Sequence, residues 1–81
     1  MSTYKDKYKE AKTWRRKVII MSLFHSVLRA RKKNHSVRFL AKYFEVSVGL
    51  VSENLRITAA SNYKRLIRCT TRKRALELLK G

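Results

Sequence analysis

Apolar residues recur at helical spacing along most of this 81-residue chain. From Ala11 they follow one another every three or four positions, through Trp14, Val18 and Met21, with a second apolar row beside the first. This spacing predicts an amphipathic helix over residues 11–31, the longest element of the fold. The preceding residues 1–10 alternate lysines with tyrosines and acids, so they either fray as an arm or extend that helix backwards.

Shorter helices are predicted after the cationic loop over residues 29–36. Ser36 is placed to cap a helix that runs to Phe44, and Ser47 is placed to cap the next, which runs to about residue 57. A short helical segment then covers residues 63–68.

The last helix begins after Thr70 or Thr71, either of which can cap it. The chain has no proline and only two glycines, which favours helices over strands. We therefore expect an all-α fold of four or five helices that forms one domain over residues 1–81.

Residues 36–57 meet the steric demands of a helix-turn-helix unit. A small residue, Ala41, lies where the second helix crosses the first closely. Phe44 follows three residues later, and Val46 places an apolar side chain inward from the turn. The residues predicted to form the core of this motif are Leu40, Ala41, Phe44, Val46, Val51 and Leu55.

The segment VRFLAKYFEVSVGLVSENLRI resembles the helix-turn-helix of DNA-binding proteins of phages, plasmids and bacteria. Its SVGLVSENLRI portion is especially similar to that of partition proteins and of small phage-encoded helix-turn-helix proteins. The resemblance covers about a quarter of the chain and implies that residues 47–57 form a recognition helix in the DNA major groove. Glu45 stands where the family usually has glycine, so it must accept a left-handed or neighbouring backbone conformation.

The resemblance also assigns base-reading candidates in the second helix by their position: Ser47, Val48, Gly49, Ser52, Glu53 and Arg56. Glycine within a helix costs about 1 kcal/mol relative to alanine. Gly49 therefore either lets the backbone approach the groove floor or relieves crowding against another helix. Glu53 accepts a hydrogen bond from a cytosine amine, pairs with Arg56 in its own helix, or does both.

Charge points to a polyanionic partner. Twenty-one Lys and Arg residues stand against five Asp and Glu, a formal net charge of +16. Such a chain repels itself unless a polyanion balances it, and double-stranded DNA is the partner that we expect. The candidates for phosphate contacts are Arg15, Arg16, Lys17, Arg31, Lys32, Lys33, Arg38, Lys42, Arg72, Lys73 and Arg74.

Other classes of function find little support in the sequence. Cys69 is the only cysteine, and His25 and His35 lack metal-site spacing, so we expect no metal and no cofactor. The five acids form no acid–base pair and no glycine-rich phosphate loop occurs, so we expect no enzyme. The longest apolar run, residues 18–23, is far shorter than the ~20 residues of a membrane span. No secretory signal is apparent.

Three roles remain open. The first is a small transcriptional regulator of phage, plasmid or bacterial origin in the bacterial cytoplasm, at the nucleoid. Either the face of Ala75, Leu76 and Leu79 or the exposed part of the long helix forms a homodimer contact, or both faces are used in the core of a monomer. The second is a phage DNA-packaging or DNA-condensing protein located in the virion, or one like a small terminase subunit, which the charge of +16 suits. The third is RNA binding, with Trp14 and the four tyrosines stacking on bases.

Overall fold

Six helices make up the described part of the chain, residues 3–33 and 36–80 of a computed structural model. They are α1 (Tyr4–Glu10), α2 (Trp14–Ala30), α3 (Val37–Phe44), α4 (Val48–Ala59), α5 (Tyr63–Ile67) and α6 (Arg72–Lys80). No strand occurs in these two ranges, which confirms the all-α prediction. Residues 34 and 35 of the predicted loop, and with them the His35 candidate, lie outside the described residues, as do residues 1–2 and 81.

The N-terminal segment accounts for the helix beyond the expected four or five. Thr3 forms a capping box: its hydroxyl accepts from the Asp6 N–H at 3.1 Å, and the Asp6 carboxylate accepts from the Thr3 N–H. Tyr8 then buries its ring, with 3% of the residue exposed. Over residues 4–10 the prediction of a fraying arm or a backward extension was therefore wrong, because these residues cap and anchor a helix of their own.

The long helix begins later than predicted. Thr13 has an extended backbone, and its hydroxyl accepts from the Arg16 N–H at 3.2 Å, so α2 starts at Trp14 rather than Ala11. With 17 residues it is still the longest helix among those described. This start places Arg15 and Arg16 in the first helical turn.

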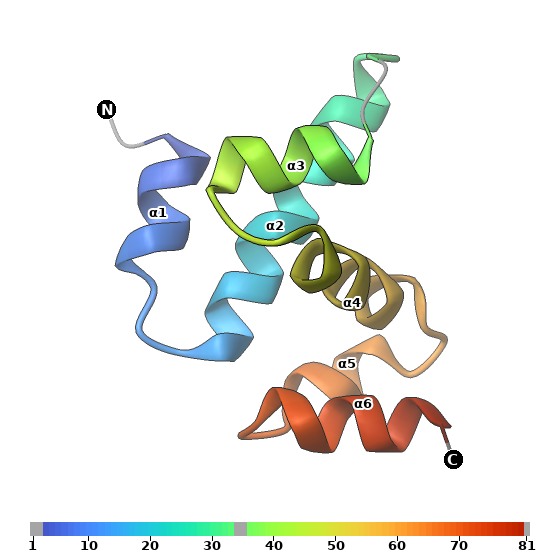
Figure 1. The fold of residues 1–81 in the computed structure, drawn as a ribbon. Coiled ribbons are helices and arrows are strands. Elements are labelled where there is room, and N and C mark those ends of the chain that lie inside the picture. The colour runs from blue at the N-terminus through green and yellow to red at the C-terminus, as the bar shows by residue number, and fades with distance from the viewer. Residues whose placement is uncertain (1–2, 34–35, 81) are drawn as a thin grey trace.

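Two hydrophobic clusters hold the helices together, and α2 and α4 contribute to both. Figure 1 shows α1 and α3 on one side of α2, with α4, α5 and α6 following one another toward the other end of the molecule. The N-terminal core consists of Tyr8, Met21, Phe24, Leu28, Leu40, Ala41, Phe44 and Val51. The C-terminal core consists of Val18, Ile57, Leu66 and Ala75.

The predicted motif core agrees with these clusters. Leu40, Ala41, Phe44 and Val51 are buried in the N-terminal core, and the half-buried Val46 and Leu55 pack against it. All six positions are therefore part of the N-terminal core or packed against it.

The turn between α3 and α4 is closed by backbone hydrogen bonds. Glu45 has φ 59° and ψ 45°, which is the left-handed one of the left-handed or neighbouring conformations predicted for it. The Val46 N–H then donates to the Ala41 carbonyl at 2.9 Å, which closes the end of α3. Ser47 caps α4 by accepting from the Leu50 N–H at 3.2 Å. We call residues 37–59 the α3–turn–α4 unit.

The turn is also tied to α1 by ionic contacts. Glu45 forms an ion pair with Lys9 and lies 3.5 Å from the Lys5 ammonium. The hydrogen bond from Lys9 and the charges of Lys5 and Lys9 lower the pKa of Glu45 below its ordinary value of 4.5. One exposed carboxylate thus links the N-terminal helix to the turn.

Acid should weaken this link. Because the pKa of Glu45 is lower in the folded protein, its stabilising effect is complete above pH 4.5 and is lost as the pH falls through the folded value. We expect the melting temperature, followed by circular dichroism from neutral pH to about pH 3, to fall more steeply for the unsubstituted chain than for Glu45→Gln. Parallel curves would mean that Glu45 does not couple folding to pH.

Candidate nucleic-acid interface

One side of α4 faces solvent near its N-terminus. Helical residues are about 100° apart around the axis, so Val48, Gly49, Ser52 and Arg56 fall within a sector of about 100°. Val48, Gly49 and Arg56 are exposed and Ser52 is half-buried. We call these four residues the α4 outer face. Ser47 is also exposed, but its hydroxyl is engaged in the cap.

Gly49 lies in open space. A β-carbon added there would meet no atom within 4 Å, so no neighbouring helix crowds this position. Of the two readings of this glycine, relief of crowding is thereby excluded. Its backbone is helical, so no positive φ demands glycine either. Because glycine has no side chain, the helix backbone is uncovered between Val48 and Ser52.

Glu53 lies at the edge of the α4 outer face, where α4 meets α6. It forms an ion pair with Arg72, and the side chains of the two residues are 33% and 34% exposed. The predicted pairing with Arg56 was therefore wrong as to the partner, because Glu53 turns toward α6 rather than along its own helix. The pair also engages Arg72, one of the phosphate candidates, within the chain.

Removing the carboxylate from this pair should loosen α6. We expect Glu53→Ala to lower the free energy of unfolding by less than about 1 kcal/mol, since both groups are partly exposed and screened by salt. A double-mutant cycle with Arg72→Ala, measured by chemical denaturation, gives the coupling. Glu77→Ala removes an exposed acid from α6 and is the control. A coupling energy of zero would mean that the ion pair between Glu53 and Arg72 does not stabilise the fold.

Most of the other phosphate candidates are exposed: Arg15, Arg16, Arg31, Lys32, Lys33, Arg38, Lys42, Lys73 and Arg74. Lys17 is half-buried instead. Its ammonium donates to the Tyr8 carbonyl at 3.1 Å and lies 4.8 Å from the centre of the Tyr8 ring. Lys17 therefore fastens α1 to α2, and its charge is engaged inside the fold.

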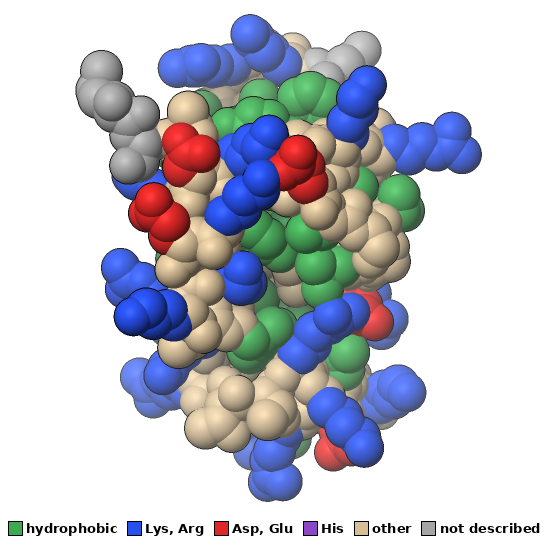
Figure 2. Space-filling model, turned by 60° about the vertical axis from the view of Figure 1, so that its left-hand side comes forward, with side chains coloured by type: hydrophobic (Ala, Val, Ile, Leu, Met, Phe, Trp, Pro, Cys, Tyr) green, Lys and Arg blue, Asp and Glu red, His purple; other side chains and the backbone are tan. Residues whose placement is uncertain are grey.

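The cations are spread over the surface rather than gathered in one row. Figure 2 shows Lys and Arg side chains around the margin and in the upper middle of one face, with hydrophobic side chains between them and acidic side chains scattered among them. Arg38 and Lys42 lie on α3, and Lys73 and Arg74 lie in the first turn of α6. Thr71 caps that turn, with its hydroxyl accepting from the Arg74 N–H at 3.3 Å.

Comparison with known proteins assigns the chain to no family. It matches no family model, no curated protein and no solved structure. Within the described ranges, no helix has the length and apolar character needed to cross a membrane. Residues 3–33 and 36–80 also contain no group of three or more His, Cys, Asp or Glu side chains placed to hold a metal ion.

The sequence analysis did not predict a buried polar contact between α4 and α2. Asn54 is 1% exposed and donates from Nδ2 to the sulfur of Met21 at 3.7 Å. Burial raises the pKa of the neighbouring Tyr8 hydroxyl, and Asn54 and Arg72 offset this only in part. The helical spacing could have predicted this burial, since Asn54 falls three residues after Val51 and three before Ile57 on the inward side of α4.

Two surfaces considered in the sequence are used within the chain. Ala75 is fully buried in the C-terminal core, and the half-buried Leu76 and Leu79 pack against the same core, so this face of α6 contributes to the fold of the chain itself. Trp14 packs there too. The aromatic rings suggested for base stacking also have partners: Tyr4, Tyr8 and Tyr43 contact phenylalanine rings, and Tyr63 packs on the C-terminal core.

Proposed function

We propose that this protein binds double-stranded DNA through the α3–turn–α4 unit and acts as a small sequence-specific regulator. The observation that carries the proposal is the α4 outer face: an uncrowded glycine flanked by exposed and half-buried side chains, at the N-terminal end of a capped helix. The N-terminal residues of a recognition helix are those that reach base edges in the major groove.

Each residue of the α4 outer face has a chemical role in this proposal. Val48 offers an exposed apolar surface to a thymine methyl, and Ser52 hydrogen-bonds a base edge. Arg56 reaches a guanine or a phosphate. Gly49 admits the backbone close to the groove floor. Glu53, held by Arg72, shapes the edge of the surface and is no longer a base reader in this proposal.

The exposed cations of α2, α3 and α6 supply the phosphate contacts. Phosphate contacts fix the register of a protein on the duplex without reading its sequence. Arg38 and Lys42 lie one turn apart on α3, and the first helix of such a unit crosses the DNA backbone. Arg15 and Arg16 on α2 and Lys73 and Arg74 on α6 extend the cationic surface.

The charge favours a second candidate function, DNA packaging or condensation. A net charge of +16 on 81 residues exceeds what one recognition helix needs. A protein of that kind binds duplex DNA through phosphates alone and needs no base-reading side chains.

Binding of a labelled duplex, followed by fluorescence anisotropy, separates the two. A duplex from upstream of the protein's own gene and a shuffled duplex are compared at about 50 and 200 mM salt. A regulator binds the native duplex more tightly, and the preference persists at the higher salt. Equal binding of both duplexes, with a joint loss of ~10³–10⁵ in affinity, supports packaging. Failure to bind either duplex at low salt would overturn the DNA-binding proposal.

A further inference from the structure

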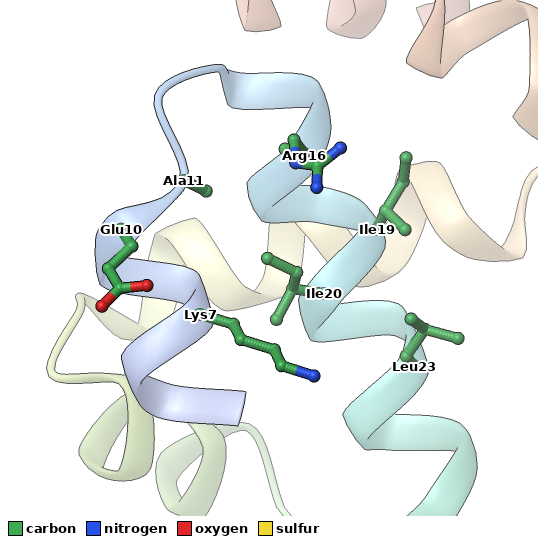
Figure 3. Close-up of a pocket in the computed structure, with 7 residues that line it drawn as sticks. All are labelled: Lys7, Glu10, Ala11, Arg16, Ile19, Ile20 and Leu23. Atoms are coloured by element: carbon green, nitrogen blue, oxygen red, sulfur yellow. The ribbon is translucent and has the colours of Figure 1, made fainter. Parts of the chain in front are cut away.

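A groove with an apolar floor runs between α1 and α2. It has a volume of about 580 Å³ and is lined by Lys7, Glu10, Ala11, Arg16, Ile19, Ile20 and Leu23. Figure 3 shows Lys7 reaching from α1 toward α2 beside Ile20, with Ile19 and Leu23 along α2 and Arg16 toward the start of that helix. The proposed DNA-binding surface uses none of these residues except Arg16.

Four of the seven residues that line the groove are apolar. Leu23 is 53% exposed, and Ile19 and Ile20 are half-buried. Ile19 and Leu23 are four residues apart, so they lie one above the other on the same side of α2. Exposed apolar surface that polar residues surround commonly marks a binding site for another molecule.

The groove faces away from α4. Met21 is fully buried and contacts Asn54 of α4. Leu23 follows two residues later, about 200° further around the axis of α2. A molecule in the groove would therefore leave the α4 outer face free.

The charges around the groove select its occupant. Lys7 and Arg16 place two cations at the rim against the single carboxylate of Glu10. A second copy of this chain would bring a further charge of +16, which opposes self-association. A small ligand is usually 70–90% enclosed by its pocket, whereas Leu23 leaves this floor half open.

We infer that the α1–α2 groove binds an acidic amphipathic helix of a partner protein. Apolar side chains spaced three or four residues apart on that helix would rest on Ile19 and Leu23, as in other helix-in-groove complexes. Its carboxylates would meet Lys7 and Arg16, which gives the contact its charge selectivity. The protein would thereby join an acidic partner on one face and leave the α4 outer face free, with Arg16 as the one residue common to both proposals.

A designed peptide tests the inference. The probe is a fluorescein-labelled, end-capped helix of about 14 residues made of Leu, Ala and Glu, with leucines three and four positions apart. Its control has serine in place of each leucine and keeps every glutamate. At about 150 mM salt, we expect the leucine peptide to bind at least about tenfold more tightly than the serine peptide.

Two substitutions in the groove, each with a matched control, locate the binding. We expect Leu23→Ser and Arg16→Glu to weaken the leucine peptide about tenfold. Phe39→Ser alters a similarly exposed apolar residue on α3, and Arg29→Glu makes the same charge change elsewhere on α2. Both controls should bind the peptide as the unsubstituted chain does.

Three results would overturn the inference. Equal affinities for the two peptides, or equal losses of affinity for Arg16→Glu and Arg29→Glu, would mean that the peptide is attracted by the overall charge of the protein and not by the groove. Concentration-dependent dimers that Leu23→Ser abolishes, seen by sedimentation, would assign the groove to a second copy. Duplex binding by Leu23→Ser should be unchanged, so the groove and the DNA proposal can fail separately.

Discussion

Phe44→Ala is expected to lower the free energy of unfolding by about 3–5 kcal/mol. Phe44 is 1% exposed, and its ring centre lies 4.8 Å from that of Tyr8 and 5.4 Å from that of Phe24. Truncation removes contacts with α1 and α2 together and leaves a cavity where three helices meet. Small domains have little stability to spare, so the variant should be largely unfolded at room temperature.

The same substitution on the same helix provides the control. Phe39 is 45% exposed, and its ring centre lies 6.3 Å from that of Tyr43. Phe39→Ala should cost less than about 1 kcal/mol. Urea denaturation of both variants, followed by circular dichroism, measures the difference. Similar losses for the two would mean that the N-terminal core does not carry the fold.

Gly49→Glu is expected to strengthen the fold and to weaken DNA binding, two effects of opposite sign. The new side chain would meet no atom within 4 Å of its β-carbon. The first turn of α4 has no acidic residue, and a carboxylate there interacts favourably with the helix dipole by about 0.3–1 kcal/mol. Under the proposed function, the same carboxylate would project into the negatively charged groove. The duplex affinity should fall about tenfold or more.

Ser26→Glu makes the same change in net charge at an exposed position of α2. We expect it to alter the duplex affinity far less than Gly49→Glu does. Fluorescence anisotropy and thermal unfolding on both variants provide the two readouts. Equal losses of affinity would mean that total charge, and not the α4 outer face, determines binding.

The sequence allowed the local features of the α3–turn–α4 unit to be predicted correctly. The caps at Ser36 and Ser47 each satisfy a backbone N–H three residues later, which is a contact within one turn. The left-handed backbone at Glu45 follows from the need to turn between two closely spaced helices. Such features depend on neighbours in the chain, so sequence spacing is enough to find them.

Two of the features that were missed depend on contacts between distant elements, whereas the late start of α2 depends on the local cap at Thr13. Within residues 4–10, the side chains that pack into the fold are those of Tyr4 and Tyr8. They stabilise α1 because their rings contact Phe24 of α2 and Phe44 of α3. The Thr3–Asp6 capping box was the one local sign of this helix. Glu53 and Arg72 are nineteen residues apart in the printed sequence. No periodicity could therefore pair them.

Glu45 meets two requirements at one position, and this constrains how the sequence can change. Glycine would relax the left-handed turn, yet it would release α1 from Lys5 and Lys9. A change at position 45 is therefore tolerated best together with a change in the cations of α1. Among sequences that share this fold, we expect an acid at 45 to accompany a cationic α1, and glycine at 45 to accompany a neutral one. The residue at position 45 would then indicate, for each of these sequences, whether an ion pair links the N-terminal helix to the turn.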